Sequence, residues 1–245
     1  MTYTLPADVK TLEWPADAAA AIAIQKALRA RLRMENDFGE LKIVAGVDVS
    51  HKDDQSRAVI VLMRMGEWQP MAIARAEMPV KFPYVPGLLS FREIPVILAV
   101  LEQLPHAPDL LMVDGQGIAH PRRLGIAAHL GVLLNIPAIG VAKSRLTGRY
   151  EEPANEKGAW TALRDREERI GTVLRSKVNC LPLFISPGHR MDQDTALEIT
   201  LSALGKYRLP EPTRIADKLS KADPADDAVM MAGPAAGLNL PIARE

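Results

Sequence analysis

Apolar runs alternate with polar segments along the first third of the chain, and their lengths predict one helix followed by three strands. Residues 15–35 are rich in alanine and arginine and predict a helix. Residues 43–49 are almost wholly apolar, which predicts a strand inside a sheet. The runs 58–63 and 71–76 predict two further strands. Because the connections between these three strands are short, we expect an antiparallel meander.

A loop of restricted shape should follow the meander. Residues 83–89 contain two prolines and a glycine, which restrict the backbone. A helix is expected to begin at Ser90, where Glu93 stands at the spacing of a capping box. Pro105 follows this segment, so the helix should end at about residue 104.

The middle of the chain predicts strands joined by a helix. Residues 110–113 and 138–142 are short apolar runs typical of buried strands. Between them a helix should run from residue 121 or 122 to residue 134. Strands that are joined by a helix are usually parallel, so we expect these two to be parallel. The charged segment 150–169 is expected to be a surface insertion.

The last part of the chain predicts a strand pair and two helices. The expected elements are strands at 170–174 and 181–185 around a turn at 178–179, a helix over 193–204 capped by Asp192, and a short helix after Pro212. Residues 1–223 are expected to form a single catalytic domain, and residues 224–245 a flexible tail. Three antiparallel strands followed by helix-linked parallel strands, flanked by helices, is the order of a ribonuclease-H-like mixed α/β sheet, although other mixed α/β folds share it.

Composition narrows the class of protein. The chain has 245 residues, of which 48% are hydrophobic and 24% charged, and this is typical of a globular α/β protein. Its single cysteine excludes a disulfide framework and favours a cytoplasmic protein. The N-terminal residues lack a signal-peptide pattern, and the most apolar early run, 18–24, is too short to span a membrane.

Charge is balanced overall but unevenly distributed. The chain carries 30 basic and 30 acidic residues, so its net charge does not point to a nucleic-acid partner. Residues 115–150, however, contain arginines, lysine and histidines and no Asp or Glu. Such a stretch can attract phosphate, although a solvated basic face would explain the same pattern.

Three carboxylates and one lysine are candidates for chemistry. Asp48 lies inside an apolar strand, where an unpaired charge is costly, and Asp114 ends another strand just before a Gly-x-Gly turn. Glu93 is a third carboxylate, and Lys143 follows the strand 138–142. Each residue also has a simpler explanation: Asp114 can open a turn, Glu93 can cap a helix, and Lys143 can be a solvated charge.

The types of these residues favour one class of metal. Carboxylates without a cysteine or histidine cluster suit Mg²⁺ or Mn²⁺ better than zinc. Such an ion can activate water and stabilise charge on a leaving oxygen, which suits hydrolysis of a phosphodiester.

Several longer motifs together resemble the endonuclease V family. The resemblance covers roughly residues 20 to 220, in order, and several of its motifs are long. The motifs lie at 44–50 (VAGVDVS), 83–93 (PYVPGLLSFRE), 113–117 (VDGQG), 120–125 (HPRRLG), 139–144 (IGVAKS), 186–189 (SPGH) and 207–214 (YRLPEPTR).

The resemblance implies a set of catalytic residues. Asp48 and Asp114 would bind Mg²⁺, for which Mn²⁺ would substitute. Glu93 would be a third acidic member of the catalytic site. Asp217 stands where the family has an acidic or histidine residue and would complete the metal site. Lys143 would contact the phosphate.

The resemblance also implies a wedge and a base pocket. Tyr84 would lead the wedge that enters the strand beside an extruded base, and Pro83, Pro86 and Gly87 would give that loop its shape. A tyrosine packed under a proline loop explains the same residues structurally.

Residues of the central motif would surround the base. Gly115, Gly117 and His120 would form the pocket and its backbone cradle, and Arg122 would bind backbone phosphate or only solvate a helix. Gln116 departs from the pattern, because many relatives have histidine there. Glutamine keeps a donor and an acceptor, but the departure puts lesion preference in question.

The activity implied is that of a DNA repair endonuclease. The family nicks DNA that contains deoxyinosine, which is deaminated adenine, at the second phosphodiester bond 3′ to the lesion, leaving 3′-hydroxyl and 5′-phosphate ends. Some relatives prefer inosine in RNA, so an RNA-directed nuclease of the same fold is one alternative. A non-catalytic nucleic-acid-binding module is another, although all three carboxylates are present. We expect a monomer.

Overall fold

An eight-stranded mixed sheet forms the centre of the protein. The computed structural model describes residues 3–222, and the predicted tail 224–245 lies outside them. The strands are β1 (Ile43–Lys52), β2 (Gln55–Arg64), β3 (Pro70–Pro79), β4 (Leu110–Val113), β5 (Ala138–Ala142), β6 (Trp160–Asp165), β7 (Glu168–Leu174) and β8 (Leu183–His189). Their order across the sheet is β3-β2-β1-β4-β5-β8-β7-β6.

The first five strands confirm the predicted topology. Strands β1, β2 and β3 form an antiparallel meander. Strand β4 pairs parallel with β1, and β5 pairs parallel with β4. This is the ribonuclease-H-like arrangement expected from the sequence. It places the C-terminal ends of the central strands β1, β4 and β5 at the same edge of the sheet.

The sheet continues further than predicted. Strand β8 pairs antiparallel with β5, and β7 and β6 follow in turn, also antiparallel. The prediction that 150–169 is a surface insertion was therefore wrong, because this segment contains β6 and the start of β7. Only Leu163 is buried in β6, since it is an edge strand. A polar edge strand lacks the apolar alternation that separates a strand from a loop.

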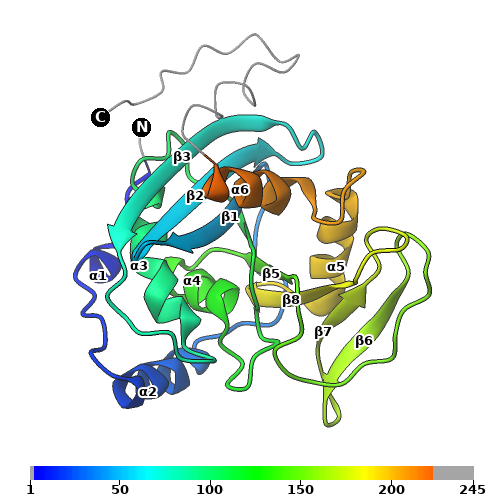
Figure 1. The fold of residues 1–245 in the computed structure, drawn as a ribbon, viewed down its shortest axis with the longest axis horizontal. Helices are drawn as coiled ribbons and strands as arrows, with labels where there is room; N and C mark the ends of the chain where they lie inside the picture. The colour runs from blue at the N-terminus through cyan, green and yellow to red at the C-terminus, as the bar shows by residue number, and fades with distance from the viewer. Residues whose placement is uncertain (1–2, 223–245) are drawn as a thin grey trace.

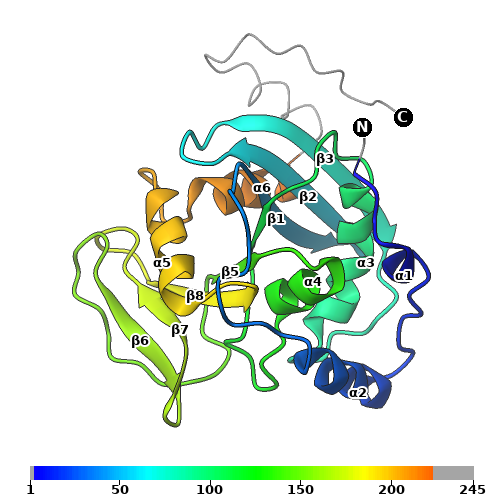
Figure 2. The same ribbon diagram turned by 180° about the vertical axis from the view of Figure 1, so that it is seen from behind.

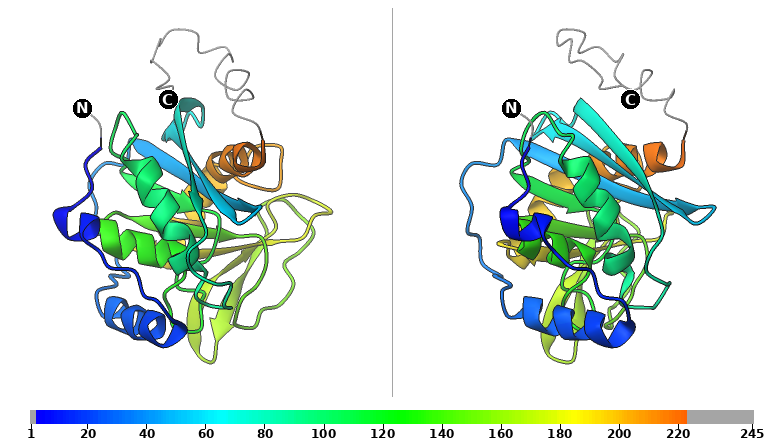
Figure 3. Two further views of the ribbon diagram at one scale, coloured as in Figure 1. Left: turned by 60° about the vertical axis from the view of Figure 1, so that its left-hand side comes forward. Right: turned by 90° about the vertical axis from the view of Figure 1, so that its left-hand side faces the viewer.

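Helices cover both faces of the sheet (Figures 1 and 2). On one face lie α3 (Leu89–Leu101) and α4 (Ile126–Leu134), with α1 (Ala7–Lys10) and α2 (Ala18–Arg29) outside them. On the other face lie α5 (Gln193–Ser202), against β7 and β8, and α6 (Glu211–Lys221), against β1 and β2. The edge-on views in Figure 3 show the sheet between these layers. None of the helices in the described part of the chain is long and apolar enough to cross a membrane.

Local sequence signals mark the starts of α2, α5 and α6. The Asp17 carboxylate accepts a hydrogen bond from the Ala20 amide, so α2 starts later than the predicted residue 15. The Asp192 carboxylate accepts from the Thr195 amide, which confirms the predicted cap of α5. Helix α6 begins at Glu211, with Pro212 in its first turn, where the missing amide hydrogen costs nothing.

One predicted helix cap and one predicted helix start were wrong. Ser90 and Glu93 do not form a capping box: α3 begins at Leu89, and the Ser90 hydroxyl is hydrogen-bonded to His129 Nδ1 at 3.0 Å. Helix α4 begins at Ile126, not at residue 121 or 122. Arg123 has a φ of +59°, which is incompatible with a right-handed helix.

Candidate metal and nucleic-acid site

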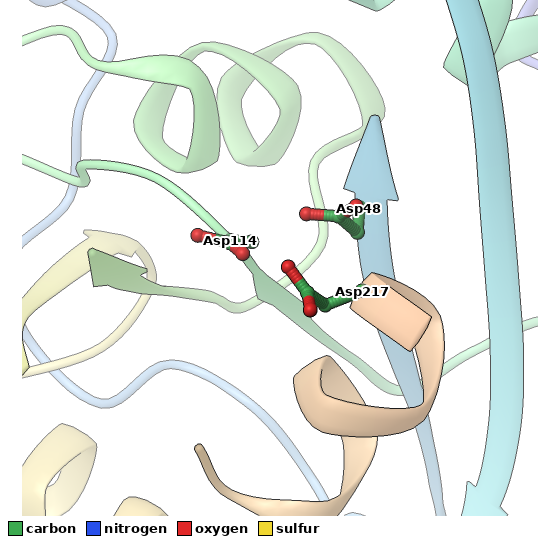
Figure 4. Close-up of side chains that lie close together, drawn as sticks. All are labelled: Asp48, Asp114 and Asp217. Carbon is green, nitrogen blue, oxygen red and sulfur yellow. The ribbon is translucent and has the colours of Figure 1, made fainter. Parts of the chain in front are cut away.

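Three aspartates converge at the edge where the central strands end (Figure 4). Strands β1 and β4 pair Val47 with Val113, so Asp48 and Asp114 are the next residues on adjacent parallel strands. Asp217 reaches them from α6. Each side chain offers one carboxylate oxygen, and these oxygens lie within 4.8 Å of one another. The sheet register therefore places Asp48 and Asp114 together, and the packing of α6 adds Asp217.

The donor set fits a hard divalent cation. It consists of carboxylate oxygens, which Mg²⁺ and Mn²⁺ prefer, and the cluster includes no thiol or imidazole among the described residues. Asp48 is almost fully buried, and three carboxylates this close repel one another unless a cation lies among them. The cluster can therefore hold a divalent metal ion.

Lys143 completes the charge balance of the cluster. It follows β5, the neighbour of β4, and its ammonium group forms ion pairs with Asp114 and Asp217. Burial lowers the pKa of Lys143, but these carboxylates outweigh that effect and raise the pKa above its ordinary value. Lys143 is therefore a permanent cation at the edge of the cluster.

The two less buried aspartates differ in pKa. Burial and the neighbouring charge of Asp48 raise the pKa of Asp114 to about 7, against the opposing effect of Lys143. Burial also raises the pKa of Asp217, but Lys143 and Lys221 outweigh it and hold that pKa below its ordinary value. Without a metal ion, Asp217 is charged at neutral pH and Asp114 is only partly so.

Ser220 holds Asp48 in place. This fully buried residue of α6 donates from its hydroxyl to Asp48 Oδ2 at 2.5 Å. The Ser50 hydroxyl in turn donates to the Ser220 carbonyl, which ties α6 to β1. The sequence reading missed Ser220. Its only local signal is that it stands three residues after Asp217, on the same side of the helix.

Glu93 lies on α3 and faces the same cavity as Asp48 and Asp114, but it is not one of the three clustered carboxylates. Burial raises its pKa, although His51 opposes this. His51 Nε2 donates to Glu93 Oε1 at 3.0 Å, and the Ser56 hydroxyl donates to His51 Nδ1 at 3.0 Å. His51 is a second neighbour of the site that the sequence reading missed.

A cavity of 410 Å³ opens beside the carboxylates. Among the predicted substrate-binding residues, Tyr84, Pro86, Gly87, Gly115 and His120 line it. Tyr84 is 70% exposed, so it is available to insert into a ligand. The dimensions suit a small planar group such as a base.

The loop that carries Tyr84 is fixed by one carbonyl. The Gly87 carbonyl accepts hydrogen bonds from Gln25 Nε2, His120 Nε2 and Arg122 Nη2, at 3.0, 2.9 and 2.7 Å. Burial lowers the pKa of His120 to about 4, so its ring is neutral near pH 7. Its Nδ1 accepts from the Arg122 amide, which assigns the proton to Nε2. Gln25, from α2, is fully buried and was not predicted.

Three of the predicted substrate-binding residues, Pro83, Gly117 and Arg122, do not line the cavity. Pro83 precedes Tyr84 in the loop. The Gly117 amide donates to Ser186 Oγ at 2.8 Å. Gln116 lines the cavity, and its Nε2 donates to the Ser144 carbonyl at 2.8 Å.

We expect the metal-free protein to lose stability as the pH rises from about 4 to about 7. Folded Asp114 has a pKa of about 7, against 3.8 for the unfolded chain, so the folded state binds more protons in this window. The stability that this proton contributes is complete below pH about 4 and lost as the pH rises to 7, up to about 4 kcal/mol. Urea unfolding with chelator, across this range, measures it.

Asp114→Asn is the control, because the amide does not titrate. Its unfolding free energy should depend less steeply on pH in this window. Equal slopes for the two proteins would contradict the elevated pKa of Asp114.

Comparison with known sequences gives one consistent result. The family model for endonuclease V matches residues 26–218. Endonuclease V from Trichormus variabilis is 50% identical over 210 residues, which cover 84% of this chain and 95% of that protein.

Comparison with solved structures also finds endonuclease V proteins. The crystal structure of the endonuclease V from Streptomyces avermitilis has a TM-score of 0.80 at 43% identity, covering 90% of this chain and 96% of that one. The Ciona intestinalis endonuclease V, in complex with DNA containing an inosine followed by a ribo-adenosine, has a TM-score of 0.69 at 28% identity, covering 82% and 95%. A. aeolicus Argonaute, at 16% identity and a TM-score of 0.50 over 75% of this chain and 29% of that one, shares the fold alone.

Proposed function

The chain belongs to the endonuclease V family, and from this premise we propose that it is a DNA repair endonuclease that recognises deoxyinosine. It hydrolyses the second phosphodiester bond 3′ to the lesion and leaves 3′-hydroxyl and 5′-phosphate ends. The observation that carries this proposal is the position of the aspartate cluster and Lys143 beside a cavity whose mouth bears an exposed tyrosine.

Asp48, Asp114 and Asp217 are the proposed ligands of Mg²⁺, or of Mn²⁺ in its place. Glu93, facing the same cavity, is the proposed fourth acidic member of the site. When bound, the ion would supply Lewis-acid activation for phosphodiester hydrolysis. Ser220 supports the site by fixing the orientation of the Asp48 carboxylate.

Lys143 is the proposed phosphate contact. Its ammonium group lies between the carboxylates of Asp114 and Asp217, so it reaches the place where a phosphate would meet the cluster. A cation there stabilises the negative charge that increases on the phosphate oxygens during hydrolysis. Because its pKa is raised, Lys143 keeps this charge at every pH at which the enzyme works.

The cavity and its loop are the proposed lesion reader. The extruded base enters the cavity, and Tyr84 fills the gap that the base leaves in the strand. The three hydrogen bonds to the Gly87 carbonyl hold the loop in position, so little entropy is lost when Tyr84 inserts. The Arg122 guanidinium donates to the Gly87 carbonyl and to Gln25 Oε1, which supports a role in positioning the loop and not in binding phosphate.

A nicking assay tests the proposal. The substrates are a labelled duplex with one deoxyinosine, its adenine twin, and a single-stranded RNA with one inosine, each with Mg²⁺ and with chelator. We expect a Mg²⁺-dependent nick at the second bond 3′ to deoxyinosine and an intact adenine duplex. Cleavage of the RNA alone would transfer the function to inosine in RNA, and no cleavage of any substrate would contradict a catalytic role. We also propose that the protein is cytoplasmic and monomeric. Sedimentation of the purified protein would test the monomeric state.

A further inference from the structure

Two loops on the α5–α6 side of the molecule expose apolar and aromatic side chains next to each other. Tyr207 is 44% exposed and Leu181 75%. The loops are joined because Arg208 Nε donates to the Leu181 carbonyl at 2.8 Å and Ser176 Oγ donates to the Arg208 carbonyl at 2.6 Å. We call the surface formed by Val178, Leu181, Lys206 and Tyr207 the Tyr207 platform.

Cations surround the tyrosine ring of this platform. The Arg214 guanidinium carbon lies 4.6 Å from the centre of the Tyr207 ring, and Lys206 Nζ lies 5.3 Å from it. Arg214 is itself held by the Glu211 carboxylate. Arg214, a residue of α6, therefore holds the Tyr207 ring in place, and the ring is still partly exposed. An exposed aromatic ring among cations is typical of a surface that stacks on the bases of a single strand.

The platform is connected directly to the proposed active site. Arg208 Nη2 donates to the Lys143 carbonyl at 2.7 Å and to the Pro182 carbonyl at 2.9 Å. Within residues 3–222, Arg208 forms these bonds with carbonyls and no ion pair with a carboxylate, so its charge is available to an anion nearby. Arg214 stands three residues before Asp217 in α6, on the same side of the helix. The platform therefore adjoins the metal cluster.

The platform and the lesion cavity lie on different sides of that cluster. Asp48, Asp114 and Lys143 line the cavity together with the Tyr84 loop, whereas neither Asp217 nor the described platform residues do. In Figure 1 the connection between α5 and α6 lies on the side of the molecule away from α2. A strand that enters the cavity at the lesion and crosses the cluster would reach the platform next.

We propose that the Tyr207 platform binds the nucleic-acid strand on the 3′ side of the cut, in single-stranded form, with an unpaired base stacked on Tyr207. Lys206 and Arg208 attract the phosphates on either side of that base. This proposal rests on the proposed function, because the position of the cut 3′ to the lesion sets the direction of the strand. Every base has a face that can stack, so the platform does not distinguish inosine from adenine.

The test uses two single-stranded DNA substrates, each with one deoxyinosine. The 3′ arm extends about 2 nucleotides beyond the cut in one and about 10 nucleotides in the other. Only the longer arm should reach the platform. We expect the KM of the wild type to be about tenfold lower for the long arm, as one stacked base gives. Tyr207→Ala should lose this arm preference and keep its selectivity for inosine over adenine. Tyr207→Phe should keep both.

Two further variants separate the platform from other surfaces. Tyr84→Ala should keep the arm preference and lose selectivity for inosine. Trp160→Ala removes another exposed aromatic, which Arg169 covers on the edge strand β6, and should change neither property. A Tyr207→Ala protein that keeps the arm preference, or a Trp160→Ala protein that loses it equally, would overturn the proposal.

Failure of the proposed function would be distinguishable from failure of the platform proposal. A wild type that does not select inosine would contradict the lesion-directed activity. The platform would still be measured by fluorescence anisotropy with a labelled adenine-only strand, which Tyr207→Ala should bind about tenfold more weakly than Tyr207→Phe. Equal affinities of these two variants would overturn the platform.

Discussion

Replacing Asp48 with asparagine is expected to lower kcat by about 10³-fold or more while the protein stays folded. Asp48 is the most buried of the clustered carboxylates, and its charge is part of what would bind the cation. Asparagine keeps the shape and one oxygen but lacks that charge. Ser220 can still donate to the amide oxygen, so the contact between α6 and β1 should persist.

Stability should respond to Asp48→Asn in the opposite direction to activity. The charge of Asp48 is one cause of the raised pKa of Asp114, so its removal should lower the pKa of Asp114 and relieve repulsion in the metal-free protein. We expect the melting temperature in chelator to be equal to or above that of the wild type. Adding Mg²⁺ should raise the melting temperature of the wild type more than that of the variant.

Asp53→Asn is the matched control for this variant. Asp53 is exposed in the turn between β1 and β2, with a φ of +50° that asparagine also tolerates. Single-turnover nicking by Asp53→Asn should equal that of the wild type. Cleavage by Asp48→Asn at the wild-type rate would remove Asp48 from the catalytic machinery.

Replacing Gly46 with alanine is expected to lower the free energy of unfolding by about 3 kcal/mol or more. A Cβ atom at Gly46 would lie 2.2 Å from the carbonyl oxygen of Pro212, in the first turn of α6. Neither backbone can give way easily, so α6 must move away from β1. That helix carries Asp217 and Ser220, so nicking activity should fall together with stability.

Gly39→Ala is the control for the glycine prediction. No atom lies within 4 Å of a Cβ placed there, so we expect a change of at most about 0.5 kcal/mol. Urea unfolding of both variants and the wild type measures the difference. Equal stability of Gly39→Ala and Gly46→Ala would show that α6 does not depend on close approach to β1.

Some features of this protein follow from short stretches of sequence. The apolar runs predict β1 to β5, because a buried strand needs only its own residues to be apolar. Asp48 and Asp114 stand out against such runs, and a charge in an apolar strand requires a partner. The prolines and Gly87 predict the rigid Tyr84 loop for a similarly local reason. The motifs add the family, and with it the expected activity.

Other features depend on residues far apart in the sequence. The bond from Ser220 to Asp48 joins residues 172 positions apart, and the bond from Gln25 to Gly87 joins residues 62 positions apart. The expected capping box did not form because the Ser90 hydroxyl is hydrogen-bonded to His129, which lies far from it in the sequence.

The sequence by itself determined the central strands, the two strand aspartates and the membership of a family. The tertiary structure decided which groups complete the site, because hydrogen bonds and close approach of helices act through space. It placed Asp217 beside Asp48 by packing α6 against Gly46, and it set the pKa of Asp114 through burial and the charge of Asp48. Burial and neighbouring charges exist only once the chain has folded.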